Sequence, residues 1–129
     1  MPRQVQLTVS LVSRPGVLAE LTRTLAEAGV NITAICAEHA GGRGKIRLIV
    51  NDPVRARRAL RKGKYRFAEE PVHVLRLRHA PGALARVAGK LGRARVNIRS
   101  VYATTAGRGS ATVVMSVGTS ARARKAMGR

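Results

Sequence analysis

Residues 14–32, RPGVLAELTRTLAEAGVNI, decide the fold of this chain. Apolar residues in this stretch recur at the spacing of one helix face, which predicts a helix from about Gly16 to Ala28 that covers a sheet. Pro15 is expected at a first helical position, where its missing N–H group costs no hydrogen bond. Gly29 is expected to end the helix.

The stretch is repeated 66 positions later in the chain. An internal repeat of this length predicts one structural unit that occurs twice. We therefore expect two small domains, residues 1–70 and residues 71–129, which gain stability by packing together. The recurring residues are Pro15, Gly16, Leu18, Ala19, Leu25 and Val30-Asn31-Ile32 in the first copy, and Pro81, Gly82, Leu84, Ala85, Leu91 and Val96-Asn97-Ile98 in the second.

Strand patterns lie on both sides of the first helix. Residues 5–11 alternate apolar and polar side chains, the period of an antiparallel strand with one face in the core and one in water. Two further strands, at about 31–38 and 45–50, enclose the glycine-rich segment 41–44. This arrangement predicts a β-hairpin with a glycine turn.

A second helix and two more strands complete the pattern. Asp52 and Pro53 start a short helix that reaches about Lys62, a strand follows at 64–68, and the first strand of repeat 2 is expected at 72–78. The order βαββαβ and then βαββα predicts an α+β fold of two ferredoxin-like sandwiches. Repeat 2 lacks the last strand, so we expect a homodimer in which the partner chain covers the edge at 72–78.

The composition excludes several classes of protein. The chain has 129 residues, one cysteine and three histidines, which predicts no disulfide, metal site or cofactor. No apolar run approaches the roughly 20 residues that a membrane helix needs, so we expect a cytoplasmic protein without membrane contact. No nucleophile with a base and no pair of carboxylates recurs in the repeats, so catalysis is not expected.

The net charge of +19 has two interpretations. Arginine-rich composition arises from GC-rich codons without any selection for a partner, or the positive field serves to attract polyanions. Seven cations lie between Arg55 and Arg66, on the outer face expected for the second helix. The chain has no Trp, two Tyr and one Phe, so contact with nucleic acid would be nonspecific. The alternative function is therefore an accessory protein that binds RNA or an acidic protein partner.

In both copies Pro-Gly-x-Leu precedes Val-Asn-Ile, within the same strand and helix context. In these motifs the sequence resembles the ACT domain family, as a stand-alone protein with two ACT domains in tandem. The resemblance implies a non-catalytic regulatory protein that binds a small amino acid at the interface between paired ACT domains. It also implies an enzyme of amino-acid metabolism as the regulated partner.

The expected site begins where the first helix begins. Backbone N–H groups of Gly16, Val17 and Leu18 are suited to receive a carboxylate at the positive end of the helix dipole. The amide of Asn31 can bind either end of a zwitterion or only the backbone of its own turn. The resemblance extends the site to Ser13, Arg14, Pro15 and Ile32 in repeat 1 and to His79, Ala80, Pro81, Gly82, Ala83, Leu84, Asn97 and Ile98 in repeat 2.

Three other residues, one cysteine and two histidines, carry side chains that often act as nucleophile or base in enzymes. Cys36 and His39 are three apart in or after a strand, which places them on opposite faces and argues against a nucleophile–base pair. His73 corresponds to Leu7 in the repeat alignment, which predicts a half-buried structural histidine.

Overall fold

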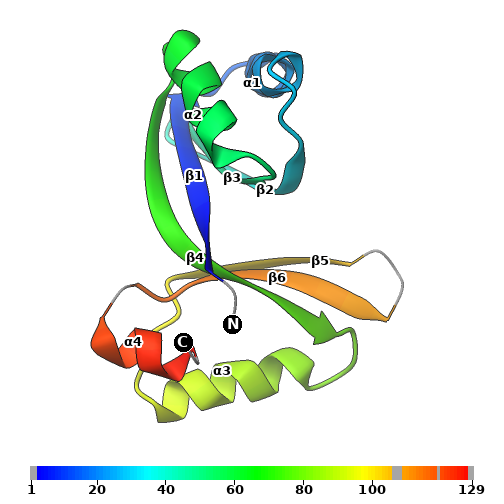
Figure 1. The fold of residues 1–129 in the computed structure, drawn as a ribbon, viewed down its shortest axis with the longest axis vertical. Helices are drawn as coiled ribbons and strands as arrows, with labels where there is room; N and C mark the ends of the chain where they lie inside the picture. The colour runs from blue at the N-terminus through cyan, green and yellow to red at the C-terminus, as the bar shows by residue number, and fades with distance from the viewer. Residues whose placement is uncertain (1–2, 106–108, 119, 128–129) are drawn as a thin grey trace. The chain divides into compact units, whose positions relative to one another are not determined.

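The computed structural model describes residues 3–105, 109–118 and 120–127 (Figure 1). Two compact units make up the chain. We call Val5–Glu70 the first unit, and Pro71–Arg129 with Met1–Gln4 the second unit. None of the described helices is long and apolar enough to span a membrane.

The first unit is an α+β sandwich of the expected ferredoxin-like type. Its strands follow the order β2-β3-β1-β4, and β3 pairs antiparallel with both β1 and β2. The elements are β1 (Arg3–Val12), α1 (Val17–Glu27), β2 (Ile32–Ala40), β3 (Arg43–Val50), α2 (Pro53–Lys62) and β4 (Arg66–Arg78).

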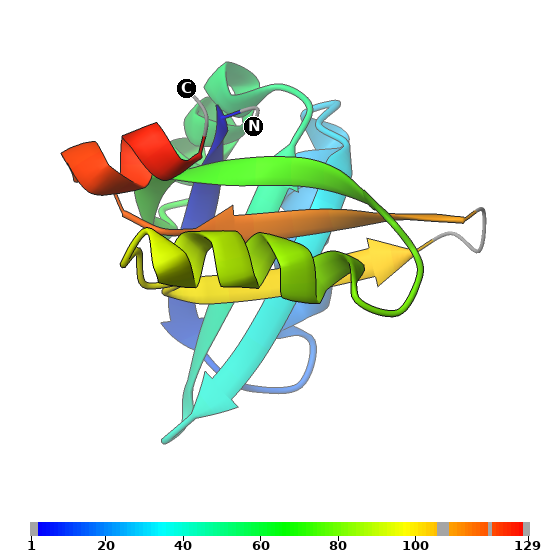
Figure 2. The ribbon, with the colours of Figure 1, turned by 90° about the horizontal axis from the view of Figure 1, so that it is seen from below.

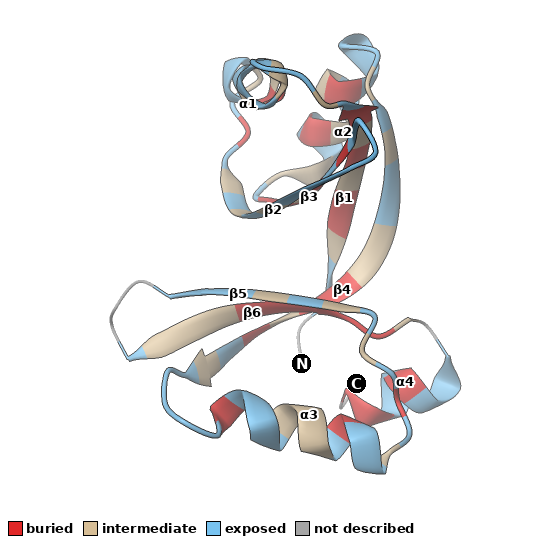
Figure 3. Ribbon diagram, turned by 180° about the vertical axis from the view of Figure 1, so that it is seen from behind, coloured by how far each residue is buried: buried red, intermediate tan, exposed pale blue. Residues whose placement is uncertain are grey.

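The core of the first unit lies between its helices and one face of its sheet. Leu7 and Val9 of β1 pack with Leu21 and Leu25 of α1, and all four are fully buried. Leu60 extends the same cluster from α2, and buried segments of β1 and α2 are visible in Figure 3. The strand period of β1 and the helical period at Leu21 and Leu25 are thus confirmed, whereas Leu18, expected on the same apolar face of α1, is 43 % exposed.

The hairpin of the first unit closes with two glycines. Ala40 pairs with Arg43, so Gly41 and Gly42 alone form the turn, and both have positive φ, at 59° and 78°. Two successive positive φ angles match the strand twist of a type I′ turn, which strongly favours glycine. The predicted glycine turn is confirmed.

The helix starts confirm one expectation and correct another. Pro53 is the first residue of α2, and Asp52 caps that helix by accepting the Arg55 N–H at 3.1 Å. Pro15, in contrast, lies outside α1, because Gly16 is the N-cap with φ at 87°. A left-handed residue between the proline and the helix leaves Pro15 in the preceding turn.

The second unit repeats the order of the first five elements, with β4 in the place of β1 and α4 as its last described element. Its strand order is β4-β6-β5, and α3 and α4 lie on the same side of these strands (Figures 1 and 2). The core contains Leu75, Leu91 and Met115. The elements after β4 are α3 (Ala83–Arg93), β5 (Ser100–Thr105), β6 (Ser110–Ser116) and α4 (Ala121–Ala126).

One continuous strand replaces two predicted ones. The expected strands at 64–68 and 72–78 are both part of β4, which runs through Pro71 without a break. The fixed φ of proline is compatible with an extended chain, so the Glu-Glu-Pro segment does not end the strand. In the strand order β4 lies between β1 and β6, and its residues 73–78 pair with β6. A partner chain that covers the other edge at 72–78 stays a prediction.

Two polar residues of the sheet are more buried than the alternation predicts. Gln6, expected on the water-facing side of β1, is fully buried, and its side chain donates to Glu70 at 3.4 Å. His73 retains 6 % exposure and has an interaction partner, so it is fully rather than half buried. Both side chains satisfy the rule that buried polar groups find partners.

Candidate functional site

A hollow of about 410 Å³ lies where α1 begins in the first unit. We call it the Ser13 hollow. Four segments build it, namely the end of β1, the first turn of α1, the end of β2 and the start of β3. Its lining residues are Leu11, Ser13, Arg14, Gly16, Val17, Leu18, Ala19, Ala37, Glu38, His39, Gly44 and Ile46.

The first turn of α1 directs N–H groups without partners at this hollow. Gly16 supplies no side-chain cap, and a Cβ at its position would meet nothing within 4 Å. Within the described residues, the N–H groups of Leu18 and Ala19 have no acceptor. The Val17 N–H donates to the Arg14 carbonyl at 3.2 Å, so of the predicted donors Val17 is already engaged. The remaining donors and the helix dipole favour an anion.

Two polar side chains of the hollow, Ser13 and His39, contact each other although they are 26 positions apart in the sequence. His39 Nδ1 lies 2.7 Å from Ser13 Oγ, and the Ser13 N–H donates to the Gly42 carbonyl at 3.0 Å. Ser13 is among the site residues predicted from the sequence, whereas His39 is not. The strand register explains why His39 belongs to the site. Gly44 of β3 pairs with Leu11 of β1 on one side and with His39 of β2 on the other, so His39 lies near the end of β1.

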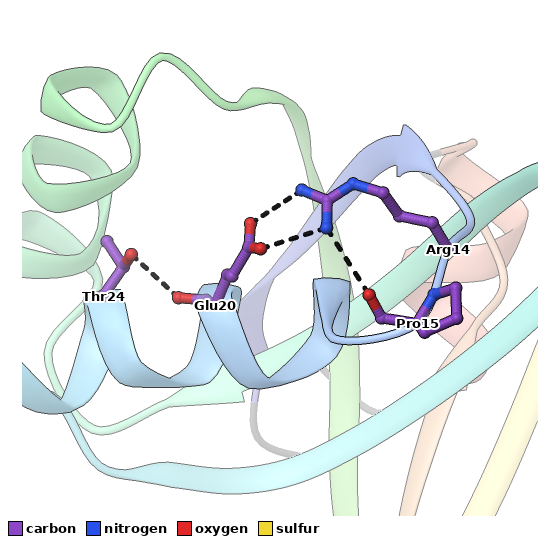
Figure 4. A network of polar contacts seen from close by, with 4 residues as sticks. All are labelled: Arg14, Pro15, Glu20 and Thr24. Carbon is purple, nitrogen blue, oxygen red and sulfur yellow. Dashed lines mark hydrogen bonds and ion pairs between the residues drawn. The ribbon is translucent and has the colours of Figure 1, made fainter.

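Arg14 is at the rim of the hollow with its charge already balanced. Its guanidinium donates to both carboxylate oxygens of Glu20, at 3.0 and 2.9 Å, and to the Pro15 carbonyl at 3.5 Å (Figure 4). The hydrogen bond from Arg14 lowers the pKa of Glu20 and raises that of Arg14 itself. Arg14 therefore orders the helix entry and is not a free cation for a ligand.

Asn31 and Ile32 are not part of the Ser13 hollow, and neither is Pro15. Asn31 precedes β2, whose first residue pairs with the end of β3, whereas Ser13 follows β1 at the opposite end of the sheet. The nine residues of β2 separate the two ends by roughly 30 Å. Asn31 and Ser13 of one unit therefore cannot contact one small molecule.

The backbone of Asn31 is held while its side chain is free. The Asn31 N–H donates to Asn51 Oδ1 at 2.8 Å, and the Asn51 N–H donates to the Asn31 carbonyl at 3.0 Å. The exposed side-chain amide of Asn31 has no hydrogen-bond partner among the described residues. Because its backbone is held in place and its side-chain amide has unused donors and an acceptor, Asn31 is suited to bind a ligand that does not contact the rest of this unit.

The second unit repeats the backbone frame with different polar side chains. The His79 N–H donates to the Gly109 carbonyl at 2.9 Å, the Ala83 N–H donates to the Ala80 carbonyl at 3.2 Å, and Gly82 has φ at 87°. Asn97 is exposed, like Asn31. Thr105 pairs with Ala111, which pairs with Leu77, so Thr105 occupies the place that His39 has in the first unit.

Cys36 is not part of the Ser13 hollow. It pairs with Arg47 across the hairpin, whereas His39 pairs with Gly44, and three positions along a strand put the two side chains on opposite faces. The thiol and the imidazole are thus separated, as the spacing predicts. Among the described residues, no group of three or more potential metal-ligating side chains occurs.

Comparison with known proteins gives one family and a set of similar structures. Residues 5–62 match the family model described as the ACT domain. A crystal structure of a protein from Bacteroides thetaiotaomicron is 30 % identical, with a TM-score of 0.87, and the match covers 97 % of this chain and 84 % of that one. No curated protein is similar enough to count as a relative.

Two more distant structures share the fold. The ligand-free regulatory subunit of aspartate kinase from Thermus thermophilus is 16 % identical, with a TM-score of 0.66 and coverage of 90 % of this chain and 86 % of that one. The corresponding subunit from Thermus flavus is 16 % identical, with a TM-score of 0.62 and coverage of 98 % and 94 %.

Proposed function

We propose, on the premise that the chain belongs to the ACT domain family through residues 5–62, that it is a non-catalytic regulatory protein that binds an amino acid. The Ser13 hollow is the observation that carries the proposal. It combines free backbone donors at the start of α1 with a serine–histidine pair, inside a hollow of a size suited to a small metabolite.

The ligand's carboxylate is assigned to the start of α1. The N–H groups of Leu18 and Ala19 are free to donate, and Gly16 lets a ligand approach the backbone closely. The apolar walls of the hollow, Ala37 and Ile46 among them, would receive the ligand's side chain. A few charge-assisted hydrogen bonds of this kind give dissociation constants of roughly micromolar to millimolar strength.

The ligand's ammonium group is assigned to the Asn31 amide of another domain. Asn31 lies at the end of the sheet remote from Ser13, so a complete site needs two domains that face each other. Binding would then stabilise the arrangement in which the two half-sites meet, which is how a ligand shifts a conformational equilibrium.

Exposed apolar side chains support the pairing of domains. Leu18 and Ile35 of the first unit are 43 % and 42 % exposed, and their counterparts 66 residues later, Leu84 and Val101, are both 44 % exposed. Leu18 lines the Ser13 hollow, and Ile35 shares a strand face with the lining residue Ala37. Repeated exposure at matching positions is typical of an interaction surface rather than of chance.

We extend the proposal to two ACT domains in tandem, residues 1–70 and 71–129, in a homodimer. The second unit supports the tandem interpretation through its repeated helix entry at Gly82 and its exposed Asn97. We assign to the partner chain the edge at 72–78 and the outer edge of β2, which ends the strand order of the described residues. The similar subunits named as regulating aspartate kinase support an enzyme of amino-acid metabolism as the target.

The melting temperature in the presence of single amino acids tests this proposal. We expect a selective rise with one or a few of them, because a ligand that binds only the folded state stabilises it by mass action. Asn31→Ala should abolish the rise without changing the melting temperature of the free protein. A flat response to all amino acids, or an undiminished rise in Asn31→Ala, would contradict the assignment.

A further inference from the structure

Five exposed cations without an acidic partner gather on the outer face of α2 and on the turn into β4. We call Arg58, Arg61, Lys62, Lys64 and Arg66 the α2–β4 basic surface. Their neighbours Arg55 and Arg57 are paired, with Asp52 at 3.7 Å and with Glu69 at 2.7 Å. The described carboxylates make no ion pair with the five. Glu69 acts on Arg61 through its charge alone, because its carboxylate is hydrogen-bonded to Arg57. The five cations therefore have no ion-pair partner among the described residues.

The surface is hollowed on both sides of α2. A hollow of about 660 Å³ is lined by Arg61, Lys64, Tyr65, Arg66, Phe67 and Glu69. A second hollow of about 380 Å³ contains Arg58 and Lys62 together with Arg55 and Glu27. The Arg61 guanidinium lies 5.7 Å from the centre of the Phe67 ring, which orders that side chain. Cations thus line two separate hollows along α2.

Lys64 occupies a backbone position that glycine would adopt more easily. The Tyr65 N–H donates to the Leu60 carbonyl and the Lys64 N–H to the Arg61 carbonyl, the two bonds of a Schellman motif. In that motif Lys64 takes φ at 62°, where an L side chain is strained. The turn therefore directs a cation into the larger hollow at the expense of stability.

We propose that the α2–β4 basic surface binds nucleic acid through its phosphates, without reading the base sequence. Arginine forks and lysine ammonium groups both recognise phosphate oxygens. Between residues 53 and 67 the one exposed large hydrophobic side chain is Val54, at 59 %, whereas the centre of a protein–protein interface is depleted of charge and built on several apolar anchors. Tyr65 and Phe67 pack partly into the core, so base stacking contributes little.

The proposal does not depend on amino-acid binding. The Ser13 hollow and the basic surface share no residue. Because phosphate contacts release counterions, five contacts to a single strand predict a slope of about −3.5 in the logarithm of affinity against the logarithm of salt concentration.

A pair of matched triple variants tests the location of binding. The first is Arg58→Gln/Arg61→Gln/Lys62→Gln, and the control on α3 of the second unit is Arg86→Gln/Lys90→Gln/Arg93→Gln. Each removes two arginines and one lysine and lowers the net charge from +19 to 19 − 3 = +16. The readout is the fluorescence anisotropy of a labelled oligouridylate at several salt concentrations.

We expect the first triple variant to weaken binding by at least about tenfold and to flatten the salt slope by about 2, since three phosphate contacts are lost. The α3 control should bind nearly as the parent protein does. Equal losses in the two variants would mean that total charge alone attracts the RNA, and would overturn the proposal. Unchanged binding in the first variant would overturn it as well.

Two single variants separate binding from stability. Lys64→Gly and Arg95→Gly each remove one cation and each place glycine at a left-handed position, with φ at 62° and 60° respectively. Both should raise the melting temperature, and only Lys64→Gly should weaken RNA binding. If polyglutamate of matched charge competes as well as RNA, the surface is a docking site for acidic protein and the proposal is wrong.

Discussion

The imidazole Nδ1 of His39 lies 2.7 Å from the hydroxyl of Ser13, and this contact joins the end of β2 to the end of β1 at the mouth of the Ser13 hollow. Ser13 is half-buried and His39 is exposed, and both line the hollow, so their polar atoms are accessible to a ligand. A hydroxyl both donates and accepts, and an imidazole nitrogen does either according to its tautomer. The pair is therefore the adaptable part of the site, whereas the helix N–H groups are its fixed part.

A double-mutant cycle measures the coupling of this pair. Ser13→Ala and His39→Ala should each weaken amino-acid binding, and the double variant should lose less than the two single losses together, because each single variant leaves the other residue without its partner. Isothermal titration with the amino acid that raises the melting temperature gives the three affinities. Strictly additive losses would show that the two side chains act independently on the ligand.

The Asn31 assignment can be separated from the stability of the loop that holds it. Asn31→Ala removes only a free amide and should leave the melting temperature unchanged while amino-acid binding weakens. Asn51→Ala removes the acceptor of the Asn31 N–H and should destabilise the protein by about 1 kcal/mol. Thermal unfolding and titration of both variants give the comparison. Equal destabilisation by the two substitutions would contradict a free Asn31 side chain.

The end of α3 is a point where the chain can be stabilised. Arg95 corresponds to Gly29 in the repeat and takes φ at 60°, whereas Gly29 takes 77°. Arg95→Gly should raise the stability by about 1 kcal/mol, because glycine adopts the left-handed region without the Cβ penalty.

The opposite substitution at the end of α1 provides the control. Gly29→Ala should lower the stability, since the added Cβ would approach Arg55 Nη1 at 3.0 Å at a positive φ. Denaturant unfolding of both variants checks the signs. A fall in stability for Arg95→Gly would mean that contacts of the arginine side chain outweigh the backbone strain.

The ion pair at the entry to α1 predicts a specific response to acid. The hydrogen bond from Arg14 lowers the pKa of Glu20 below its ordinary value of 4.5, so the pair favours the folded state above that value and loses this contribution as pH falls through the lower, folded pKa. Arg14→Gln should return the Glu20 pKa toward 4.5. NMR titration of the side-chain carboxyls measures it.

Glu38 is the internal reference for this titration. A hydrogen bond from Arg47 lowers its pKa by the same mechanism, and that pair is untouched by a change at Arg14. In Arg14→Gln we expect the Glu38 titration to stay where it is while that of Glu20 moves upward. A common shift of both carboxyls would indicate a change in the overall field of the protein rather than the loss of one ion pair.

Local sequence determined the elements of this protein, and tertiary structure decided the site. Alternation along β1, the apolar face of α1 and the Gly41-Gly42 turn depend on interactions within a few residues, and periodicity reveals them. The continuity of β4 through Pro71, the pairing of His39 with Ser13 and the distance between Ser13 and Asn31 depend on which strands lie side by side. Strand register joins residues far apart in the chain, and no local pattern records it.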